Sequence, residues 1–343
     1  MAKVSICIPV YNRAEQLDRA LRSAIGQTYS DLDIIVLDNA STDASLEVAR
    51  SHAAHDPRVR VERNDTTLDK AANWRRCLSF ARGEYVKLLF SDDWISEEAI
   101  ERAVRVLDAR PDIGFVYTAM SWTEHGSTNT CYTADSDEDM ASVDFLYRSA
   151  TIADLVPVST SCVVVRTSDA VTLFEERIPA RLSRDTHHIG VGYSAILLWR
   201  CCDRYPAVHH IGAVLAHSAE ATSGELNSRT RYRDQYETLW WGYRNAFAHF
   251  LSGCGQPDEV LRGLMTTVVV STVPLRPYGA RKRLRRLRLL FPELRMLALR
   301  PFQARVRPFL AHRLLHPPDP VEILGPSTPS RTRAVRASRG AAR

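Results

Sequence analysis

The sequence has 343 residues, of which 45% are apolar and 25% are charged. This length allows one or two domains, and the apolar share is that of a soluble globular protein rather than a disordered, collagen-like or disulfide-stapled chain. The seven cysteines form no CxxC pair and no regular spacing, which argues against a zinc site or a disulfide framework and favours a reducing cytosol.

The net charge of +5 is unevenly distributed. Residues 276–343 hold 17 lysines and arginines against three acidic residues, whereas residues 1–275 are acidic overall. A basic tail of this kind suggests an anionic partner. The N-terminal apolar run is too short for a signal peptide, and no apolar run reaches the length of a membrane span, so we expect a cytoplasmic protein.

The first 118 residues alternate between predicted strands and helices. Continuous β-branched runs predict buried parallel strands, and apolar residues at helical spacing predict the connecting helices. We expect strands at residues 4–10, 33–37, 59–63, 84–90 and 114–117, and helices at residues 12–26, 70–81 and 97–109, with another helix capped within residues 41–43 and running to Arg50. The short connections predict an open α/β sheet with right-handed crossovers.

The rest of the chain gives weaker signals. Residues 119–160 lack periodicity and include an acidic stretch, which predicts a long loop or lid. Beyond it we expect strands at residues 163–165, 208–211 and 214–216, and helices at residues 196–202, 229–250, 258–270 and 282–290. We therefore divide the chain into a domain at 1–227 with halves 1–118 and 119–227, a helical basic region at 228–324, and a disordered tail at 325–343.

Polar clusters follow three of the predicted strands: Pro9-Val10-Tyr11-Asn12, Asp38-Asn39 and Asp92-Asp93. Ligands of open α/β sheets bind at the carboxyl ends of the strands, so these clusters are expected to share one site. Adjacent carboxylates favour a divalent cation that completes its coordination shell with substrate phosphates. As alternatives, one aspartate of the pair caps the following helix while the other is solvated, and Asp38 is a turn residue that bonds its own backbone.

The sequence VSICIPVYNRAEQLDRALRSAIGQTYSDLDIIVLDNASTD, followed by NWRRCLSFARGEYVKLLFSDDW, resembles family 2 glycosyltransferases with the GT-A fold. The resemblance covers about residues 3–118 and carries P-V-Y-N, D-x-x-S-T-D, N-W with G-E-Y, and S-D-D in family order. It implies a Rossmann-like open twisted sheet flanked by helices, here with a helical C-terminal extension, and inverting transfer from a nucleoside-diphosphate sugar. Many relatives have D-D-G-S-T-D where this chain has Asp38-Asn39-Ala40-Ser41, so the base preference does not transfer with the resemblance.

The resemblance also implies roles for individual residues. The nucleotide pocket is lined by Pro9, Tyr11 and Asn12, with Asp38 at the base edge, Thr66, Leu68 and Lys70 in a closing loop, and Asn73 and Arg76 on the helix beneath the donor. Asp92 faces the ribose or sugar, and Asp93 ligates Mn²⁺ or Mg²⁺. His217 is expected as a third metal ligand, with a hydrogen-bonded turn histidine as the alternative. UDP or dTDP is expected as the nucleotide rather than GDP.

Direct displacement at the sugar also requires a general base. Relatives carry an acid in a pattern like x-D-x-x-L-x-L-R, but the corresponding residues 193–200 contain none. We nominate Asp185, with His187 or His188 as substitutes and a surface turn as the alternative.

Residues 281–291 place leucines among arginines, an amphipathic pattern suited to an anionic lipid surface. Peripheral contact at the inner face of a membrane would fit a lipid-linked acceptor, and docking of the leucines on the catalytic body is the alternative. No nucleic-acid-binding module accompanies the tail, so nucleic acid is not an expected partner. The acceptor is an unidentified hydroxyl of a bacterial glycan, lipid-linked or natural-product molecule. Two other functions stay open: a sugar nucleotidyltransferase, and a nucleotide-sugar-binding scaffold without turnover.

Overall fold

The computed structural model describes residues 2–124, 126–151, 157, 159–174, 177–179, 192–218 and 236–272. All of these residues belong to one compact unit, residues 1–296. The expected boundaries at 227 and 324, the helix expected at 282–290 and the tail at 325–343 lie outside the described residues.

Strands and helices alternate through the first part of the chain. The order is β1 (Val4–Val10), α1 (Ala14–Ile25), β2 (Leu32–Asp38), α2 (Ser45–His55), β3 (Val59–Arg63), α3 (Lys70–Ser79), β4 (Tyr85–Leu88), β5 (Asp93–Ile95) and α4 (Ala99–Ala109). There follow β6 (Ile113–Glu124), β7 (Ser127–Cys131), β8 (Glu138–Ala141), α5 (Ser142–Thr151), the 3₁₀ turn η1 (Thr160–Cys162), β9 (Val163–Arg166), α6 (Thr167–Leu173), α7 (Tyr193–Arg204), β10 (Ala207–Ser218), α9 (Tyr236–Leu251) and α10 (Asp258–Thr272).

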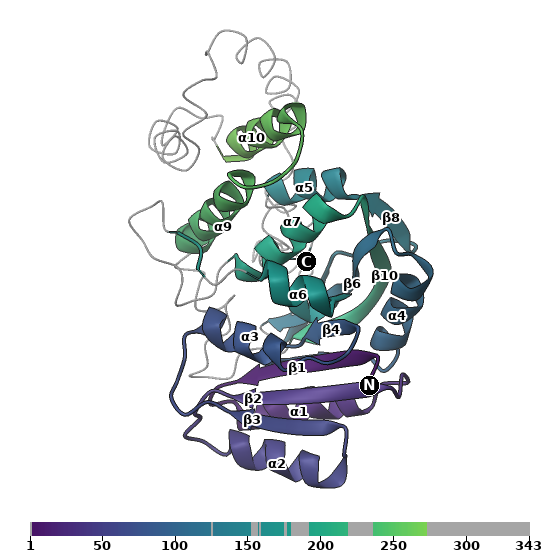
Figure 1. Cartoon of the computed structure of the whole chain (residues 1–343), viewed down its shortest axis with the longest axis vertical. Helices are drawn as coiled ribbons and strands as arrows, with labels where there is room; N and C mark the ends of the chain where they lie inside the picture. The colour runs from purple at the N-terminus through teal and green to yellow at the C-terminus, as the bar shows by residue number, and fades with distance from the viewer. Residues whose placement is uncertain are drawn as a thin grey trace, which may run out of the picture. The chain divides into compact units, whose positions relative to one another are not determined.

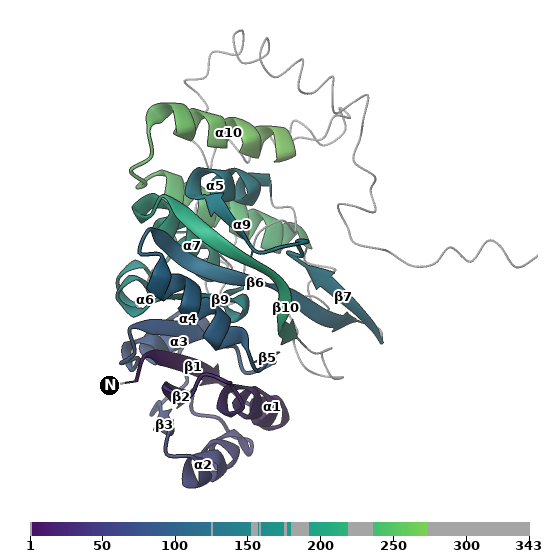
Figure 2. The same cartoon turned by 90° about the vertical axis from the view of Figure 1, so that its right-hand side faces the viewer.

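The strands form one mixed sheet in the order β3-β2-β1-β4-β9-β6-β10-β5, with β7 paired to β6 and β8 to β10. Strands β3, β2, β1 and β4 run parallel, and β9 enters antiparallel between β4 and β6. Helices α1, α2 and α4 pack on one face, and α3, α6 and α7 pack on the other (Figures 1 and 2). The predicted open α/β sheet flanked by helices is therefore confirmed.

The core follows from the apolar pattern of the central strands. All seven residues of β1 are buried, as expected for a strand covered by helices on both faces. Helix α1 places its buried residues at helical spacing, at Leu17, Ala20, Leu21 and Ala24. The register of β1 and β2 sets Val10 beside Asp38, so both strands end at the same level of the sheet. This shared level brings the polar residues that follow the two strands together.

The prediction of a long loop or lid at residues 119–160 is wrong. Strand β6 continues to Glu124 and pairs with β7, and the acidic stretch contributes to β8, which is followed by α5. The sequence of β7, STNTC, has no apolar alternation because most of that strand is exposed. It is a strand because it pairs with β6, a partner that periodicity alone does not reveal.

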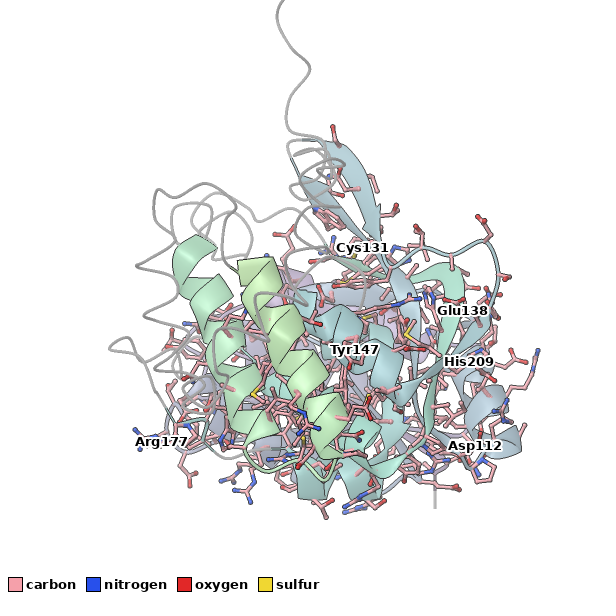
Figure 3. All side chains as sticks on the ribbon, turned by 90° about the horizontal axis from the view of Figure 1, so that it is seen from above. Asp112, Cys131, Glu138, Tyr147, Arg177 and His209 are labelled. Carbon is pink, nitrogen blue, oxygen red and sulfur yellow. The ribbon has the colours of Figure 1, made fainter. Side chains whose placement is uncertain are left out.

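The acidic stretch is fixed by basic side chains. Asp137 binds Arg102 at 3.0 Å, and Asp139 binds Arg110 and His209 at 2.7 Å each. Figure 3 shows Glu138 and His209 on the same side of the molecule, where β8 pairs with β10. The two strands expected at 208–211 and 214–216 are one strand, β10, whose register with β6 shifts between Ile211 and Val214.

Helix α10 packs closely on α5. A Cβ added to Gly263 of α10 would lie 2.0 Å from Tyr147 Oη of α5, so any larger residue would force the Tyr147 ring to move. Figure 3 shows Tyr147 at this helix pair. Among the described helices, none combines the length and the apolarity that a membrane crossing would need.

Candidate functional site

The loops after β1 and β2 are joined into one unit. Asn12 Oδ1 accepts hydrogen bonds from Thr42 N at 2.8 Å and from Thr42 Oγ1 at 3.3 Å. Backbone amides of the first loop donate to side chains of the second, Asn12 N to Ser41 Oγ at 3.0 Å and Arg13 N to Ser45 Oγ at 2.9 Å. The first and second polar clusters predicted from the sequence therefore lie together.

Two residues of this unit adopt left-handed backbone, Asn12 with φ 50° and Ala40 with φ 58°. Asparagine tolerates this conformation, whereas alanine has a Cβ that clashes in it. Ala40 occupies the position where many relatives are expected to carry glycine. The turn therefore adopts left-handed backbone at Ala40, although glycine would adopt this conformation without a clashing Cβ.

Asp38 ends β2 with a fully buried side chain. Its carboxylate accepts from Ser41 N at 3.2 and 3.4 Å, and Arg63 Nε lies 3.3 Å from Oδ2. The alternative of a turn aspartate therefore accounts for the contact with Ser41 N but not for the ion pair with Arg63. A carboxylate has about four acceptor positions, so these donors leave capacity for a further N–H group.

Three buried asparagines fasten the loop between β3 and α3. Asn39 Nδ2 donates to Leu68 O at 2.9 Å, and Leu68 N donates to Asn39 Oδ1 at 2.9 Å. Asn64 Nδ2 donates to Asn39 Oδ1 at 2.7 Å and to Asn73 Oδ1 at 2.9 Å. The sequence indicated Asn39 and Asn73 as separate site residues, but it predicted neither Asn64 nor the asparagine cluster that the three form (Asn39, Asn64, Asn73). Its only advance signal was asparagine directly after a buried strand.

The other residues predicted to line the nucleotide pocket differ in exposure. Pro9 is buried within β1, whereas the Tyr11 side chain is 46% exposed, unusually so for a large ring. Thr66, Lys70 and Arg76 are exposed. Tyr11 is thus a large aromatic ring that the unit formed by the two loops presents to solvent.

Asp92 joins the third polar cluster to the first. Arg13 Nη1 lies 2.5 Å from Asp92 Oδ2, and both side chains are partly exposed. This ion pair ties the end of β4 to the loop after β1. Helix α4 begins at Ala99 with Glu98 at its N-cap, so neither aspartate of the pair caps it.

Asp93 is 5% exposed and lies at the start of β5. Burial and, next, the Asp92 carboxylate raise the pKa of Asp93 to about 7, against the opposing effect of hydrogen bonds from the Ser161 and Ser218 side chains. A nearby cation would therefore stabilise the ionised form of Asp93 against both its burial and the negative charge of Asp92. The pKa of Lys87, also buried, is lowered to about 8 because burial disfavours its charge.

His217 lies on the opposite face of the sheet from Asp93. In the β5–β10 ladder Asp93 pairs with Ser218 and Trp94 pairs with His217, and side chains alternate between faces along a strand. The His217 ring stacks on Trp94, and its two nitrogens contact Ser96 Oγ at 2.9 Å and Ser121 Oγ at 2.8 Å. This placement favours the alternative of a hydrogen-bonded histidine over a metal ligand.

Trp94 and Trp199, two rings that could stack on a sugar, have protein partners. Arg19 lies over the Trp94 ring at 4.1 Å, and Trp199 of α7 packs edge-on against Phe247 of α9 at 4.7 Å. The helix α7, formed by the residues that lack the expected acid, is buried along most of its length. Asp185, His187 and His188 lie outside the described residues.

The carboxylate pair fits a hard divalent cation. Asp92 and Asp93 supply carboxylate oxygens, which Mg²⁺ and Mn²⁺ prefer, and one or two carboxylates suffice when substrate phosphates complete the shell. Within the described ranges no group of three or more His, Cys, Asp and Glu side chains is placed to hold a metal by itself. The described residues therefore provide part of a coordination shell, which a bound diphosphate would complete.

Comparison with known proteins points to one enzyme family. Residues 5–143 match the model of the family Glycosyl transferase family 2. The putative glycosyltransferase EpsE of Bacillus subtilis is 33% identical over 119 residues, 34% of this chain and 43% of EpsE. The chain spans less than half the length of the curated relatives that it matches first.

Two groups of solved structures share the fold. TarS 1-349 of S. aureus, in complex with UDP-GlcNAc, has a TM-score of 0.59 at 15% identity and covers 86% of this chain and 92% of its own. The mannosyltransferase PcManGT of Pyrobaculum calidifontis, in complex with GDP-Man and Mn²⁺, has a TM-score of 0.51 at 18% identity and covers 92% and 81%. Residues 5–143 of this chain therefore belong to glycosyl transferase family 2, and the described sheet and helices have the GT-A fold.

Proposed function

We propose that the chain is an inverting glycosyltransferase that moves a sugar from a nucleoside-diphosphate sugar to an acceptor hydroxyl. The carrying observation is the junction of the carboxylate pair with the loops after β1 and β2, through the contact of Arg13 with Asp92. Such a junction at the carboxyl ends of parallel strands is where open α/β sheets bind nucleotides. The family match over residues 5–143 supports the reaction class.

The nucleotide would lie on the unit formed by the loops after β1 and β2. Tyr11 offers an exposed ring for stacking on the base, and Asp38 retains acceptor capacity for a base N–H. The loop fixed by the asparagine cluster, with Thr66, Leu68 and Lys70, would close one side, above Asn73 and Arg76. Uracil and thymine present an N3–H that Asp38 could accept, as guanine does with its N1–H, so the proposal of UDP or dTDP rests on TarS, which binds UDP-GlcNAc.

A divalent ion, Mn²⁺ or Mg²⁺, would be held by Asp93 with Asp92 beside it and would stabilise negative charge on the departing diphosphate. PcManGT binds Mn²⁺ with its donor, which supports this part of the proposal. His217 is left out of the ligand set because its ring lies on the other face of the sheet. Arg13 would keep Asp92 oriented toward the ribose or sugar.

The acceptor hydroxyl would lose its proton to a general base as it attacks the anomeric carbon, and Asp185 is our candidate. The residue lies outside the described ranges, so its role rests on the sequence. Asp185→Asn is expected to bind donor as the wild type does and to lose at least 100-fold in transfer. Transfer equal to that of the wild type would eliminate Asp185 as the base.

Residues 281–291, also outside the described ranges, are proposed to contact an anionic membrane surface from the cytoplasmic side. The protein is then expected to sediment with phosphatidylglycerol vesicles but not with neutral phosphatidylcholine vesicles. Replacement of Leu284, Leu287 and Leu290 by serine should abolish this sedimentation. Equal sedimentation of the variant would remove the segment from the proposal.

The deciding experiment is calorimetric titration with UDP, dTDP and GDP, each with and without Mn²⁺, followed by an assay of nucleoside diphosphate release from the matching sugar nucleotide. Metal-dependent binding of one nucleotide together with release supports the enzyme. Binding without release in the presence of candidate acceptors would favour a nucleotide-sugar-binding scaffold. Release of pyrophosphate from a nucleoside triphosphate and a sugar phosphate would instead indicate a sugar nucleotidyltransferase.

A further inference from the structure

Lys87 is a buried cation in the middle of β4. Lys87 is only 3% exposed, although lysine is almost never fully buried without partners. Its Nζ donates to two main-chain carbonyls, Ser161 O at 2.5 Å and Val163 O at 3.5 Å. Both acceptors belong to the segment formed by η1 and the first residue of β9.

These contacts begin where the main-chain pairing of β4 with β9 ends. The ladder between the two strands joins Tyr85 to Arg166 and Val86 to Val165. Beyond Val86 the main chains of β4 and β9 are no longer paired. There the Lys87 ammonium, rather than a backbone N–H, donates to the carbonyls of Ser161 and Val163. Lys87 therefore fastens η1 to the carboxyl end of β4, at the level of the carboxylate pair.

Ser161 connects this contact to Asp93. The Ser161 side chain, which is fully buried, accepts a hydrogen bond from Phe90 N at 3.1 Å, and Phe90 O accepts one from Asp93 N at 3.0 Å. The Ser161 hydroxyl is also near enough to the Asp93 carboxylate to lower its pKa. Lys87 thus holds the main chain of Ser161, and the Ser161 hydroxyl holds the turn that leads to Asp93. A shift of η1 would move the Ser161 hydroxyl away from both Phe90 and Asp93.

We propose that Lys87 is a positioning residue for the metal-binding carboxylate of Asp93 and acts through Ser161. The inference rests on the proposed function, because it assigns Asp93 to the metal. Groups that orient a metal ligand typically contribute 10- to 100-fold to metal affinity. Lys87 would therefore set the affinity for Mn²⁺ without touching the metal, the nucleotide or the sugar.

The test measures Mn²⁺ dissociation constants of the full chain by electron paramagnetic resonance of free Mn²⁺, at saturating UDP and well below the melting temperature. Lys87→Met, which keeps the chain length and removes the donors, is expected to weaken Mn²⁺ binding about tenfold or more. Ser161→Ala should do the same. The matched control is Lys3→Met, because Lys3 binds Glu84 and Asp108 on the surface and should leave the constant within twofold.

A double variant separates positioning from general destabilisation. If Lys87 acts through Ser161, Lys87→Met with Ser161→Ala binds Mn²⁺ no more weakly than the weaker single variant. Fully multiplicative losses would overturn the route through Ser161. A Lys87→Met protein with a lower melting temperature but wild-type Mn²⁺ affinity would overturn the proposal. If Lys87→Met does not fold, the same measurements are made on Lys87→Gln, which retains an N–H donor.

Binding measurements on the wild-type protein distinguish failure of this inference from failure of the proposed function on which it rests. Wild-type protein that binds neither Mn²⁺ nor any of the nucleotides would overturn the proposed function and this inference with it. Wild-type binding together with unchanged affinity in the Lys87 variants would overturn the inference alone. Weakened binding in the Lys87 and Ser161 variants, with normal binding in Lys3→Met, would support both.

Discussion

The two sides of the candidate site are built with different chemistry. The nucleotide side, around Asn12, Ser41 and the asparagine cluster, is held mainly by hydrogen bonds between uncharged groups, with the pair of Asp38 and Arg63 as a charged contact. The phosphate side holds charged groups at close range, the ion pair of Arg13 with Asp92 and the buried Asp93 and Lys87. The nucleotide side should therefore respond less to pH and salt than the phosphate side.

The strongest way to break this contrast is to remove the buried carboxylate. Asp93→Ala is expected to lower Mn²⁺-dependent nucleotide binding and transfer at least 100-fold, because it removes the carboxylate proposed to hold the metal. Its folding should be preserved, since burial already disfavours the charged form of Asp93. The control is Asp112→Ala, which should bind and turn over normally. Asp112 is a partly exposed residue labelled in Figure 3, and it pairs with Arg110.

The pH dependence of metal binding sharpens the contrast. The pKa of Asp93 is raised to about 7, so below that pH a proton competes with the metal for the carboxylate. Mn²⁺ affinity should fall about tenfold per pH unit below 7 and level off above it. Calorimetry at pH 5.5, 6.5, 7.5 and 8.5 checks this, and a flat profile over that range would contradict the pKa assigned to Asp93.

Stability without metal should follow the same group with a definite sign. Because the pKa of Asp93 is higher in the folded than in the unfolded chain, the folded state holds its proton to higher pH. The stabilisation is complete below about pH 4, near the unfolded pKa, and is lost as the pH rises through 7. The melting temperature should thus decline from pH 5 to pH 8 in the wild type and decline less in Asp93→Asn.

On the nucleotide side, the informative change is Asn39→Asp. An aspartate can accept from Leu68 N and Asn64 Nδ2, but it cannot donate to Leu68 O, and it places a second buried carboxylate beside Asp38. The free energy of unfolding should fall by about 1 to 3 kcal/mol. Asn129→Asp, in the largely exposed strand β7, is the control and should stay within about 0.5 kcal/mol in urea denaturation.

Features of this fold are predictable from the sequence where the interacting residues lie close together in the chain. Strands β1 to β4 were predictable because each carries its own apolar pattern, and the carboxylate pair was predictable because it directly follows such a strand. Strand β7 was missed because its only support is its partner. Ser161 lies 74 residues from Lys87, and Asn64 lies 25 residues from Asn39, so no local pattern could join these side chains.

The smallest expected effect tests the turn that shapes the nucleotide side. Ala40 pays a steric cost for its φ of 58°, which glycine would avoid, although glycine also loses more backbone freedom on folding. Ala40→Gly should therefore raise the free energy of unfolding by about 0.5 to 1 kcal/mol. Ala54→Gly, in helix α2, should lower it by about 1 kcal/mol, so the same substitution acquires opposite signs at two positions. Destabilisation of both variants to the same extent would mean that Ala40 does not hold the left-handed conformation in solution. Nucleotide affinity unchanged within twofold in Ala40→Gly would show that the turn is fixed by its bonds to Asn12 and Asp38 rather than by the residue at its tip.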